Sequence, residues 1–213
     1  MHFHIVTLFP KAFDSYLGES ILKRAIEDKK LKVSFYNPRD FADNAYKRID
    51  RPPYAGGPGM VIQAEPVIKA IAKAKGKKNA KIIFLSPSGK QFTNSYASSV
   101  AKKYKDMIIV SGRYEGIDAR VKKVFKMEEV SVGPFVLTGG ELPAMLIIDV
   151  VARQIPGILG NLGSLEESRT ASPDVYTRPE KFVYKGKAYK VPKILLSGDH
   201  TKIEAWKQKR KGI

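Results

Sequence analysis

The segment KIIFLSPSGKQFTNSYASSVAKKYKDMIIVSGRYEGID, residues 81–118, contains the pattern that decides the fold. An apolar run, Lys81 to Leu85, ends in Ser-Pro-Ser-Gly and predicts a strand followed by a turn. Tyr96 and Val100 are spaced as on a helix, and a second apolar run, 107–110, precedes another glycine. Strands that alternate with helices predict an α/β protein with a covered parallel sheet. Ligands of such sheets bind beyond the carboxyl ends of the strands.

The same alternation extends on both sides of this segment. The predicted elements are strands at Phe3–Phe9 and Leu31–Tyr36, a helix around Ile21–Ile26, a Pro- and Gly-rich loop at 47–60, a helix from about Pro66, and an apolar helix at Glu141–Arg153 that ends before Pro156-Gly157. We therefore expect a sheet domain over 1–160, a polar linker over 161–175, and a small, basic, mostly helical C-terminal domain over 176–213.

Composition excludes several classes of protein. The chain has no cysteine, so disulfides, thiolate nucleophiles and cysteine-based zinc sites are ruled out. Its first residues lack the basic start and apolar core of a signal peptide. The longest apolar run is interrupted by Asp149, Arg153 and Pro156, so it does not predict a membrane span. We expect a soluble, cytoplasmic protein without a membrane partner.

The charge is strongly positive: 38 Lys and Arg against 21 Asp and Glu give a formal charge of +17. One interpretation is a generally lysine-rich surface. The distribution favours a polyanion partner instead, because ten Lys or Arg and only two acids follow from Lys181 onward. Aromatic residues such as Phe182 and Tyr189 are interleaved with them, as on an RNA-contacting surface.

Glycine-rich segments follow the predicted strands, but none fits a common nucleotide motif. In the segment that ends in Gly89-Lys90, Phe84 stands where a P-loop needs its first glycine, and Gln91 replaces the Ser or Thr. After Gly57 and Gly59, Ile62 stands where a dinucleotide motif needs a third glycine. ATP, GTP and NAD sites of the standard kinds are therefore not predicted. Tight glycine turns still let a backbone approach a ligand closely.

Seven segments, in the right order, resemble the TrmD family of tRNA (guanine37-N1)-methyltransferases. They are Asp50–Met60 (DRPPYAGGPGM), Leu85–Gly89 (LSPSG), Ser111–Asp118 (SGRYEGID), Val132–Ala144 (VGPFVLTGGELPA), Arg153 with Ile155–Gly157, Tyr176–Pro179 (YTRP) and Leu195–His200 (LLSGDH). The chain ends soon after Trp206, so its basic C-terminal domain is short for the family.

The resemblance implies a deep trefoil knot of the SPOUT type in the C-terminal half of the sheet domain. It implies S-adenosylmethionine as the methyl donor, the anticodon stem-loop of tRNA as partner, and a homodimer whose sites use both chains. Mg²⁺ stays open as a second cofactor, no residue is assigned to a metal, and no DNA partner is expected. The cofactor residues implied are Leu85, Ser86, Pro87, Gly112, Glu115, Ser131, Val132, Gly133, Phe135, Leu137, Gly139 and Gly140.

The chemistry also predicts catalytic residues. Guanine N1 carries a proton, so its methylation needs a carboxylate base and a cation near O6. The resemblance assigns Arg153 and Glu115 to the site. The family's Asp-Ser base segment matches Glu167-Ser168 here, so Glu167 is the predicted base, with Asp174 and Glu115 as alternatives. The predicted tRNA-binding residues are Tyr54, Lys207, Lys209, Arg210 and Lys211.

Two other functions stay open at this stage. The changed base and the short C-terminal domain would suit a knotted RNA-binding protein that has lost catalysis. A related methyltransferase acting on ribosomal RNA or on a ribose hydroxyl is the second alternative. Retention of Arg153 and Glu115 favours a working enzyme over the first. The loop that ends in Gly59-Met60 and the segment up to His200 favour tRNA over the second.

Overall fold

The computed structural model describes residues 1–159 and 174–209. The chain divides into two compact units, Met1–Gly160 and Asn161–Ile213. In the first unit the strands are β1 (His2–Val6), β2 (Lys32–Tyr36), β3 (Asp50–Arg51), β4 (Val61–Ile62), β5 (Ala80–Gln91), β6 (Asp106–Val110) and β7 (Glu128–Ser131). Its helices are α1 (Asp14–Leu17), α2 (Ser20–Glu27), α3 (Ala64–Lys75), α4 (Asn94–Lys103), α5 (Val121–Val124) and α6 (Glu141–Arg153), with short 3-10 helices at Pro10–Phe13 and Pro38–Phe41.

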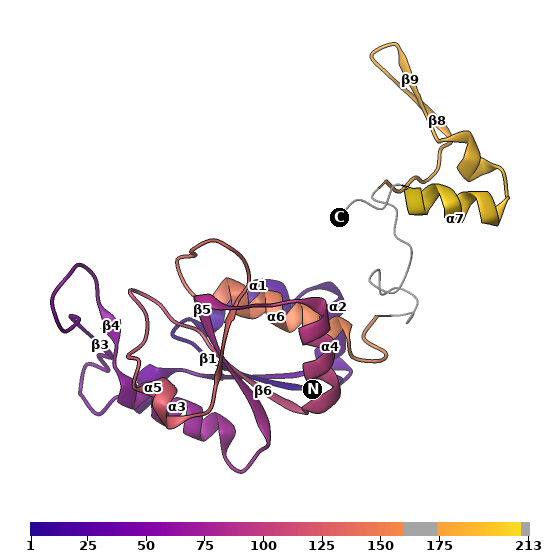
Figure 1. The fold of residues 1–213 in the computed structure, drawn as a ribbon. Coiled ribbons are helices and arrows are strands. Elements are labelled where there is room, and N and C mark those ends of the chain that lie inside the picture. The colour runs from indigo at the N-terminus through magenta and orange to yellow at the C-terminus, as the bar shows by residue number, and fades with distance from the viewer. Residues whose placement is uncertain (160–173, 210–213) are drawn as a thin grey trace. The chain divides into compact units, whose positions relative to one another are not determined.

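Five strands form one parallel sheet in the order β2-β1-β6-β5-β7. The two faces of the sheet are covered by different helices. Phe3, Ile5 and Ile109 share a buried cluster with α1, α2, α4 and α6, while Val6 and Ile108 pack against α3 and α5 (Figure 1). The central strands are thus buried on both sides, and the prediction of a covered parallel sheet is confirmed.

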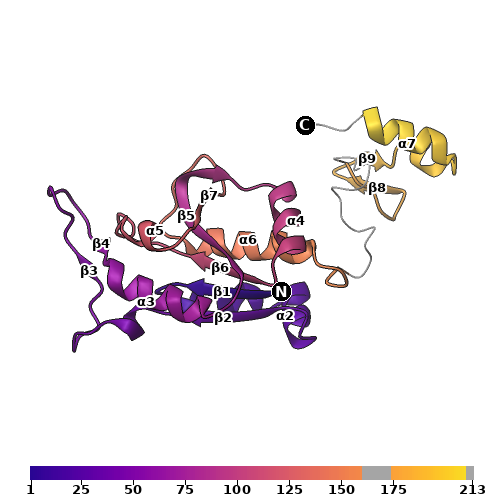
Figure 2. The ribbon, with the colours of Figure 1, turned by 60° about the horizontal axis from the view of Figure 1, so that its bottom comes forward.

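Strand β5 is longer than predicted. It continues through Ser86–Gln91, with a shift of register between Leu85 and Lys90, and pairs with β7 over both parts; Figure 2 shows the two strands side by side. A Cβ on Gly89 would lie 2.5 Å from the backbone nitrogen of Val130. The glycine there permits close approach of two strands, and the irregularity between Leu85 and Lys90, which both pair with Val130, lies where the turn was predicted.

Helix α6 has the predicted bounds, Glu141 to Arg153. Ala144, Ile147 and Val151 are among its buried residues and fix it against the sheet. Its opposite side leaves Leu142 59% exposed. The sequence predicted the bounds of this helix correctly because its apolar periodicity begins at the polar residue Glu141 and ends before Pro156-Gly157.

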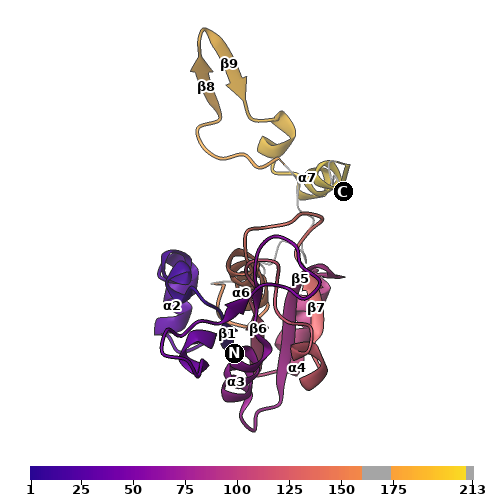
Figure 3. The ribbon, with the colours of Figure 1, turned by 90° about the vertical axis from the view of Figure 1, so that its left-hand side faces the viewer.

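The second unit contains a hairpin of β8 (Lys181–Tyr184) and β9 (Lys187–Lys190), a 3-10 helix (Lys193–Leu196) and α7 (His200–Lys209) (Figure 3). The prediction of a mostly helical C-terminal domain did not include this hairpin. Lys185 and Gly186 form the two-residue turn, both with positive φ, between two strands that each contain lysine and aromatic residues. Within the described ranges no helix has the length and apolar character of a membrane span.

Candidate active site

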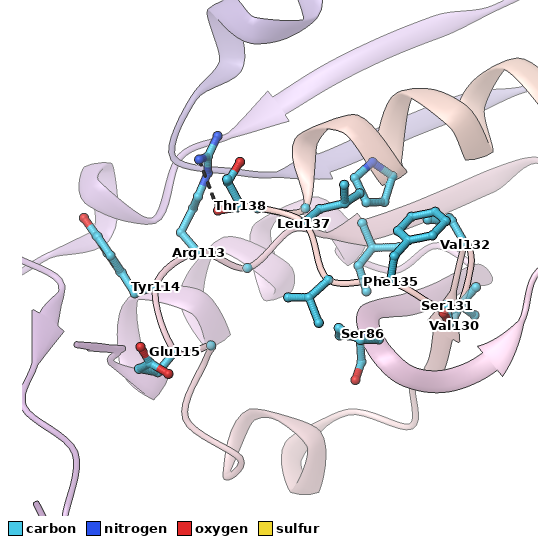
Figure 4. A pocket seen from close by; sticks show the side chains of 18 residues that line it. Ser86, Arg113, Tyr114, Glu115, Val130, Ser131, Val132, Phe135, Leu137 and Thr138 are labelled. Atoms are coloured by element: carbon cyan, nitrogen blue, oxygen red, sulfur yellow. Dashed lines mark hydrogen bonds between the residues drawn. The ribbon is translucent and has the colours of Figure 1, made fainter. Parts of the chain in front are cut away.

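A cavity of about 270 Å³ lies at the carboxyl ends of β5, β6 and β7. Its walls come from the end of β5, the segment after β6, and the loop after β7 that leads into α6 (Figure 4). The lining residues are Leu85, Ser86, Pro87, Gly112, Arg113, Tyr114, Glu115, Gly116, Val130, Ser131, Val132, Phe135, Val136, Leu137, Thr138, Gly139, Gly140 and Pro143. The position agrees with the expected location of a ligand on a parallel sheet.

The loop after β7 is fastened to the segment after β6 by backbone contacts. The Gly140 nitrogen donates to the Gly112 carbonyl at 2.9 Å, and the Ser111 hydroxyl donates to the Gly140 carbonyl at 3.1 Å. A Cβ on Gly140 would lie 2.6 Å from the Ser111 α-carbon, and one on Gly139 would overlap the Arg113 guanidinium. Two glycines are therefore needed for the loops to meet and enclose the cavity.

An ion pair between a buried carboxylate and a partly exposed arginine fixes the same corner. Glu141, at the first position of α6, is 3% exposed and accepts from the Thr7 hydroxyl at 2.7 Å and from Arg113 Nε at 2.8 Å. Arg113 also donates to the Thr138 carbonyl at 3.3 Å, as the dashed line in Figure 4 shows, and lies over the Phe9 ring. The ends of β1 and β6 and the start of α6 are thus tied together by one carboxylate.

Glu115 is an exposed carboxylate on the cavity wall. Its backbone nitrogen donates to the Met60 carbonyl at 3.0 Å, which joins the cavity to the loop before β4. A Cβ on Gly59, whose φ is +81°, would overlap the Glu115 carboxylate. The glycine-rich loop therefore packs directly on the one acidic side chain among the described residues of the cavity wall, and that side chain can accept a proton or a hydrogen bond.

The structure brings together all the sequence-predicted cofactor residues except Gly133, which packs under the Phe135 ring instead of lining the cavity. The prediction did not include Arg113, Tyr114, Gly116, Val130, Val136, Thr138 and Pro143, which also line it. Arg113 and Tyr114 stand within the SGRYEGID segment, so that motif was the available signal.

The remaining predicted residues lie elsewhere. Arg153 ends α6, and the 13 residues of that helix span about 18 Å, so this arginine cannot reach the cavity of its own chain. Tyr54 is 96% exposed in the β3–β4 loop. Lys207 lies on α7 and donates to Glu204 at 2.7 Å, and Lys209 ends that helix. Glu167, Arg210 and Lys211 lie outside the described residues.

Together these features define a class of protein: a parallel α/β enzyme that binds a small ligand in backbone-lined loops at the strand ends. Residues 1–212 match the family model described as tRNA (Guanine-1)-methyltransferase TrmD. The chain belongs to the TrmD family.

Named relatives agree with this assignment over almost the whole chain. The tRNA (guanine-N(1)-)-methyltransferase of Clostridioides difficile (strain 630) is 43% identical over 98% of this chain and 91% of that protein. The protein of the same name from Caldanaerobacter subterraneus subsp. tengcongensis is 45% identical, over 99% of this chain and 86% of its own length. The one from Pseudoalteromonas atlantica is 42% identical over 98% and 79%.

Proposed function

We propose that the protein transfers a methyl group from S-adenosylmethionine to N1 of guanosine 37 in tRNA, in the cytoplasm. The observation that carries the proposal is the cavity at the strand ends, in a chain whose residues 1–212 match the family model. The related proteins are named for the guanine-N1 reaction on tRNA.

The residues present suit an adenosyl ligand. Leu85, Val132 and Leu137 offer apolar contacts for a flat base, and the loops at Gly112 and at Gly139–Gly140 offer backbone donors and acceptors. The bound cofactor supplies an electrophilic methyl group on a sulfonium. The protein contributes a preformed cradle, since the loops are already hydrogen-bonded to each other. Gly133 belongs to this site indirectly, by supporting Phe135.

Proton removal from guanine N1 is assigned to Glu167, with Glu115 and Asp174 as the competing carboxylates. Among the described cavity residues Glu115 is the sole carboxylate, so it is placed to contact the guanine. Mg²⁺ prefers oxygen ligands and retains water, so a magnesium ion here would depend on Glu115 together with groups of the substrate.

A homodimer completes the site in this proposal. Leu142 and Leu146 are 59% and 40% exposed on α6, and Arg153 lies on the same face of that helix. Val136, on the adjacent loop, is 81% exposed. A second copy of the chain that covers this apolar stripe would bring its Arg153 to the interface. That arginine could then reach the cavity of the first chain, although it cannot reach the cavity of its own chain.

The sheet domain, 1–160, also carries a deep trefoil knot in this proposal. Support comes from the way the chain after β7, at the sheet edge, packs across the segment after β6 before α6 begins. The contacts are Gly140 to Gly112 and Arg113 to Thr138 and Glu141. Close contact between these two segments is one condition that a threaded chain must meet.

The C-terminal unit, 176–213 after the linker at 161–175, binds the tRNA backbone. Its hairpin exposes Lys181, Lys185, Lys187 and Lys190 beside the stacked pair Phe182 and Tyr189, whose centroids are 5.3 Å apart. Lysines bind phosphates and aromatic rings stack on bases, so the hairpin joins the predicted Tyr54, Lys207, Lys209, Arg210 and Lys211 as a contact surface.

Nucleoside mass spectrometry tests the proposal. The protein is incubated with S-adenosylmethionine and tRNA transcripts that carry guanosine at position 37, with a matched transcript that carries adenosine there. We expect 1-methylguanosine only from the first. Methylation of the second transcript, a different methylated nucleoside, or no product while the cofactor binds would contradict the proposed function.

A further inference from the structure

At the end of the sheet opposite the cavity, where β1 and β6 begin, two histidines and an aspartate lie together. His2 and His4 are two positions apart on β1, so their rings are on the same face of the sheet, and the ring centroids are 3.8 Å apart. Asp106, the first residue of β6, is the register partner of His2. One ligand atom from each of the three residues lies within 4.8 Å of the others.

The nitrogen atoms of the two rings that point away from Asp106 are held by hydroxyl groups on β2. His2 Nε2 lies 2.9 Å from the Ser34 hydroxyl, and His4 Nδ1 lies 3.1 Å from the Tyr36 hydroxyl. The other two nitrogens therefore face the carboxylate: His4 Nε2 is 2.9 Å and His2 Nδ1 is 3.8 Å from Asp106 Oδ1. Metal-bound histidines are oriented in this way, with the second ring nitrogen fixed by a hydrogen bond.

The distances fit a small metal ion. Ligand bonds of about 2.0–2.2 Å in a tetrahedron separate neighbouring ligand atoms by about 3.3 Å. The observed separations of 2.9 and 3.8 Å from Asp106 lie on either side of that value. Side chains of Asp106 and His2 are each 21% exposed, so an ion and a completing water can enter from solvent, while His4 is fully buried behind them.

We propose that His2, His4 and Asp106 form a binding site for a divalent transition metal of the zinc class, with water as the fourth ligand. Imidazole nitrogen selects zinc-like ions over Mg²⁺ and Ca²⁺, which prefer oxygen. Binding needs a lone pair on His4 Nε2, so the His4 proton moves to Nδ1 and is donated to Tyr36, whose hydroxyl can accept as well as donate. No proton leaves the site.

The charges around the cluster both favour and oppose the binding of a metal ion. Burial, and then the charge of the neighbouring ring and of Lys32 and Lys78, lower the pKa of His2 to about 4, and burial also lowers the pKa of His4. The two lysines oppose a dication, and Asp106 offsets part of their charge. The lysines should therefore limit the affinity.

The site would stabilise the fold and take no part in methyl transfer. Its three ligands come from the amino-terminal parts of β1 and β6, whereas the cavity lies at the carboxyl ends of the strands. A bound ion would cross-link β1 to β6, so it should raise the melting temperature and leave turnover unchanged.

The test uses full-length protein without a histidine tag, stripped with a chelator and titrated with ZnCl₂, and separately with CoCl₂ followed by visible absorption. The chain has no cysteine and only one further histidine, His200. We expect one ion per chain, cobalt bands without thiolate character, and a rise in melting temperature with zinc. His200→Gln is the matched control and should bind as the wild type does.

Two variants remove a ligand, His2→Gln and Asp106→Asn, and one removes an orienting hydroxyl, Tyr36→Phe. The Tyr36→Phe change should weaken zinc binding about tenfold or more, and loss of a ligand should weaken it further. Melting of the metal-free variants shows whether they fold. The proposal would be overturned if the wild-type protein bound no zinc, or if the folded variants bound zinc as tightly as the wild type. It would also be overturned if His200→Gln weakened zinc binding as much as the ligand variants do.

Discussion

Glu141 is a single carboxylate that accepts two hydrogen bonds in the interior, from Thr7 and from Arg113. In Glu141→Gln the amide oxygen can keep one of these donors, but the NH₂ group then faces the other. The substitution leaves the charge of Arg113, whose side chain is 28% exposed, without its carboxylate partner, so we expect the free energy of unfolding to fall by about 2 kcal/mol.

Urea unfolding at pH 7 measures this loss, and cofactor affinity should fall with it because Arg113 borders the cavity. Glu129→Gln is the control, since Glu129 pairs with Lys122 near the surface and such pairs contribute about 1 kcal/mol or less. If the two substitutions lowered the free energy of unfolding equally, the Glu141–Arg113 pair would stabilise the fold no more than a surface pair does.

The assignment of the proton acceptor is also decided by single residues. Glu167→Gln retains shape and hydrogen bonding but removes basicity, so single-turnover methylation should fall on the order of a hundredfold. Cofactor affinity should be unchanged, because the base contacts guanine. Glu115→Gln and Asp174→Asn are the comparisons. Normal turnover in Glu167→Gln together with an inactive Glu115→Gln would transfer the role to Glu115.

At the level of the elements, Glu128 joins two strands and a helix. At the start of β7, it accepts from Lys81 of β5 and, at 3.0 Å, from the Tyr96 hydroxyl of α4. The pKa of Glu128 is lowered from its ordinary value of 4.5, first by the hydrogen bond from Lys81 and then by that from Tyr96. The two hydrogen bonds thus favour the ionised form in the folded state.

A carboxyl group with a lowered pKa in the folded state stabilises the protein above its ordinary pKa, and that stabilisation disappears as the pH falls through the lowered value. Glu128→Gln should therefore lower the free energy of unfolding by about 1–2 kcal/mol at pH 7. Below pH 4.5 the gap to wild type should shrink. Urea unfolding at several pH values tests this, and a gap that is constant with pH would contradict it.

The elements that sequence patterns predicted well have strong apolar periodicity and clear ends, as α6 has between Gly140 and Pro156-Gly157. Strand β7 was not predicted because Glu128 and Glu129 interrupt its apolar pattern. Their charges are accommodated by lysines on neighbouring elements, which a local pattern cannot report. The extension of β5 past Leu85 likewise depends on a partner strand that is 40 residues away in the sequence.

Eleven of the twelve residues predicted to hold the cofactor lie together in the cavity wall. The glycines of the candidate site are explained by contacts that only the folded chain reveals, such as Gly139 against Arg113 and Gly59 against Glu115. The cluster of His2, His4 and Asp106 was missed because its members come from strands about 100 residues apart that pair in register. Residue spacing along the chain contains no signal for such a group.

For the whole molecule, the pairing of the C-terminal lysines predicts which of them contact the phosphates of tRNA. Lys207 and Lys202 on α7 are paired with Glu204 and Asp199. In the hairpin, Lys185 of the turn and Lys187 at the start of β9 lie against aromatic rings instead. The double substitution of Lys185 and Lys187 by Gln should lower the salt slope of tRNA binding by about two. Lys207→Gln should change it less. Filter binding between 50 and 200 mM salt measures both, and equal slopes for all three proteins would exclude the hairpin as a phosphate contact.

Symmetric assembly gives a sharper prediction, because the helix that begins at the cavity ends about 18 Å away with Arg153. Suppose that each site combines Glu115 of one chain with Arg153 of the other. A homodimer of Arg153→Ala then has no complete site, and neither has a homodimer of Glu115→Gln. A heterodimer of the two variants has one complete site and one that lacks both groups. Random exchange makes half of the dimers heterodimers, so the mixture should recover about a quarter of wild-type activity.

Mixing after mild unfolding and refolding, followed by methylation of tRNA, measures this recovery. Each variant refolded alone is the control for activity regained by refolding itself. Leu146→Glu, which places a charge in the exposed apolar stripe of α6, should give a monomer by light scattering and abolish recovery when it is combined with either variant. If Arg153 acted within its own chain, each heterodimer would contain one chain without Arg153 and one without Glu115. No complete site would then form, and the mixture would be as inactive as its components.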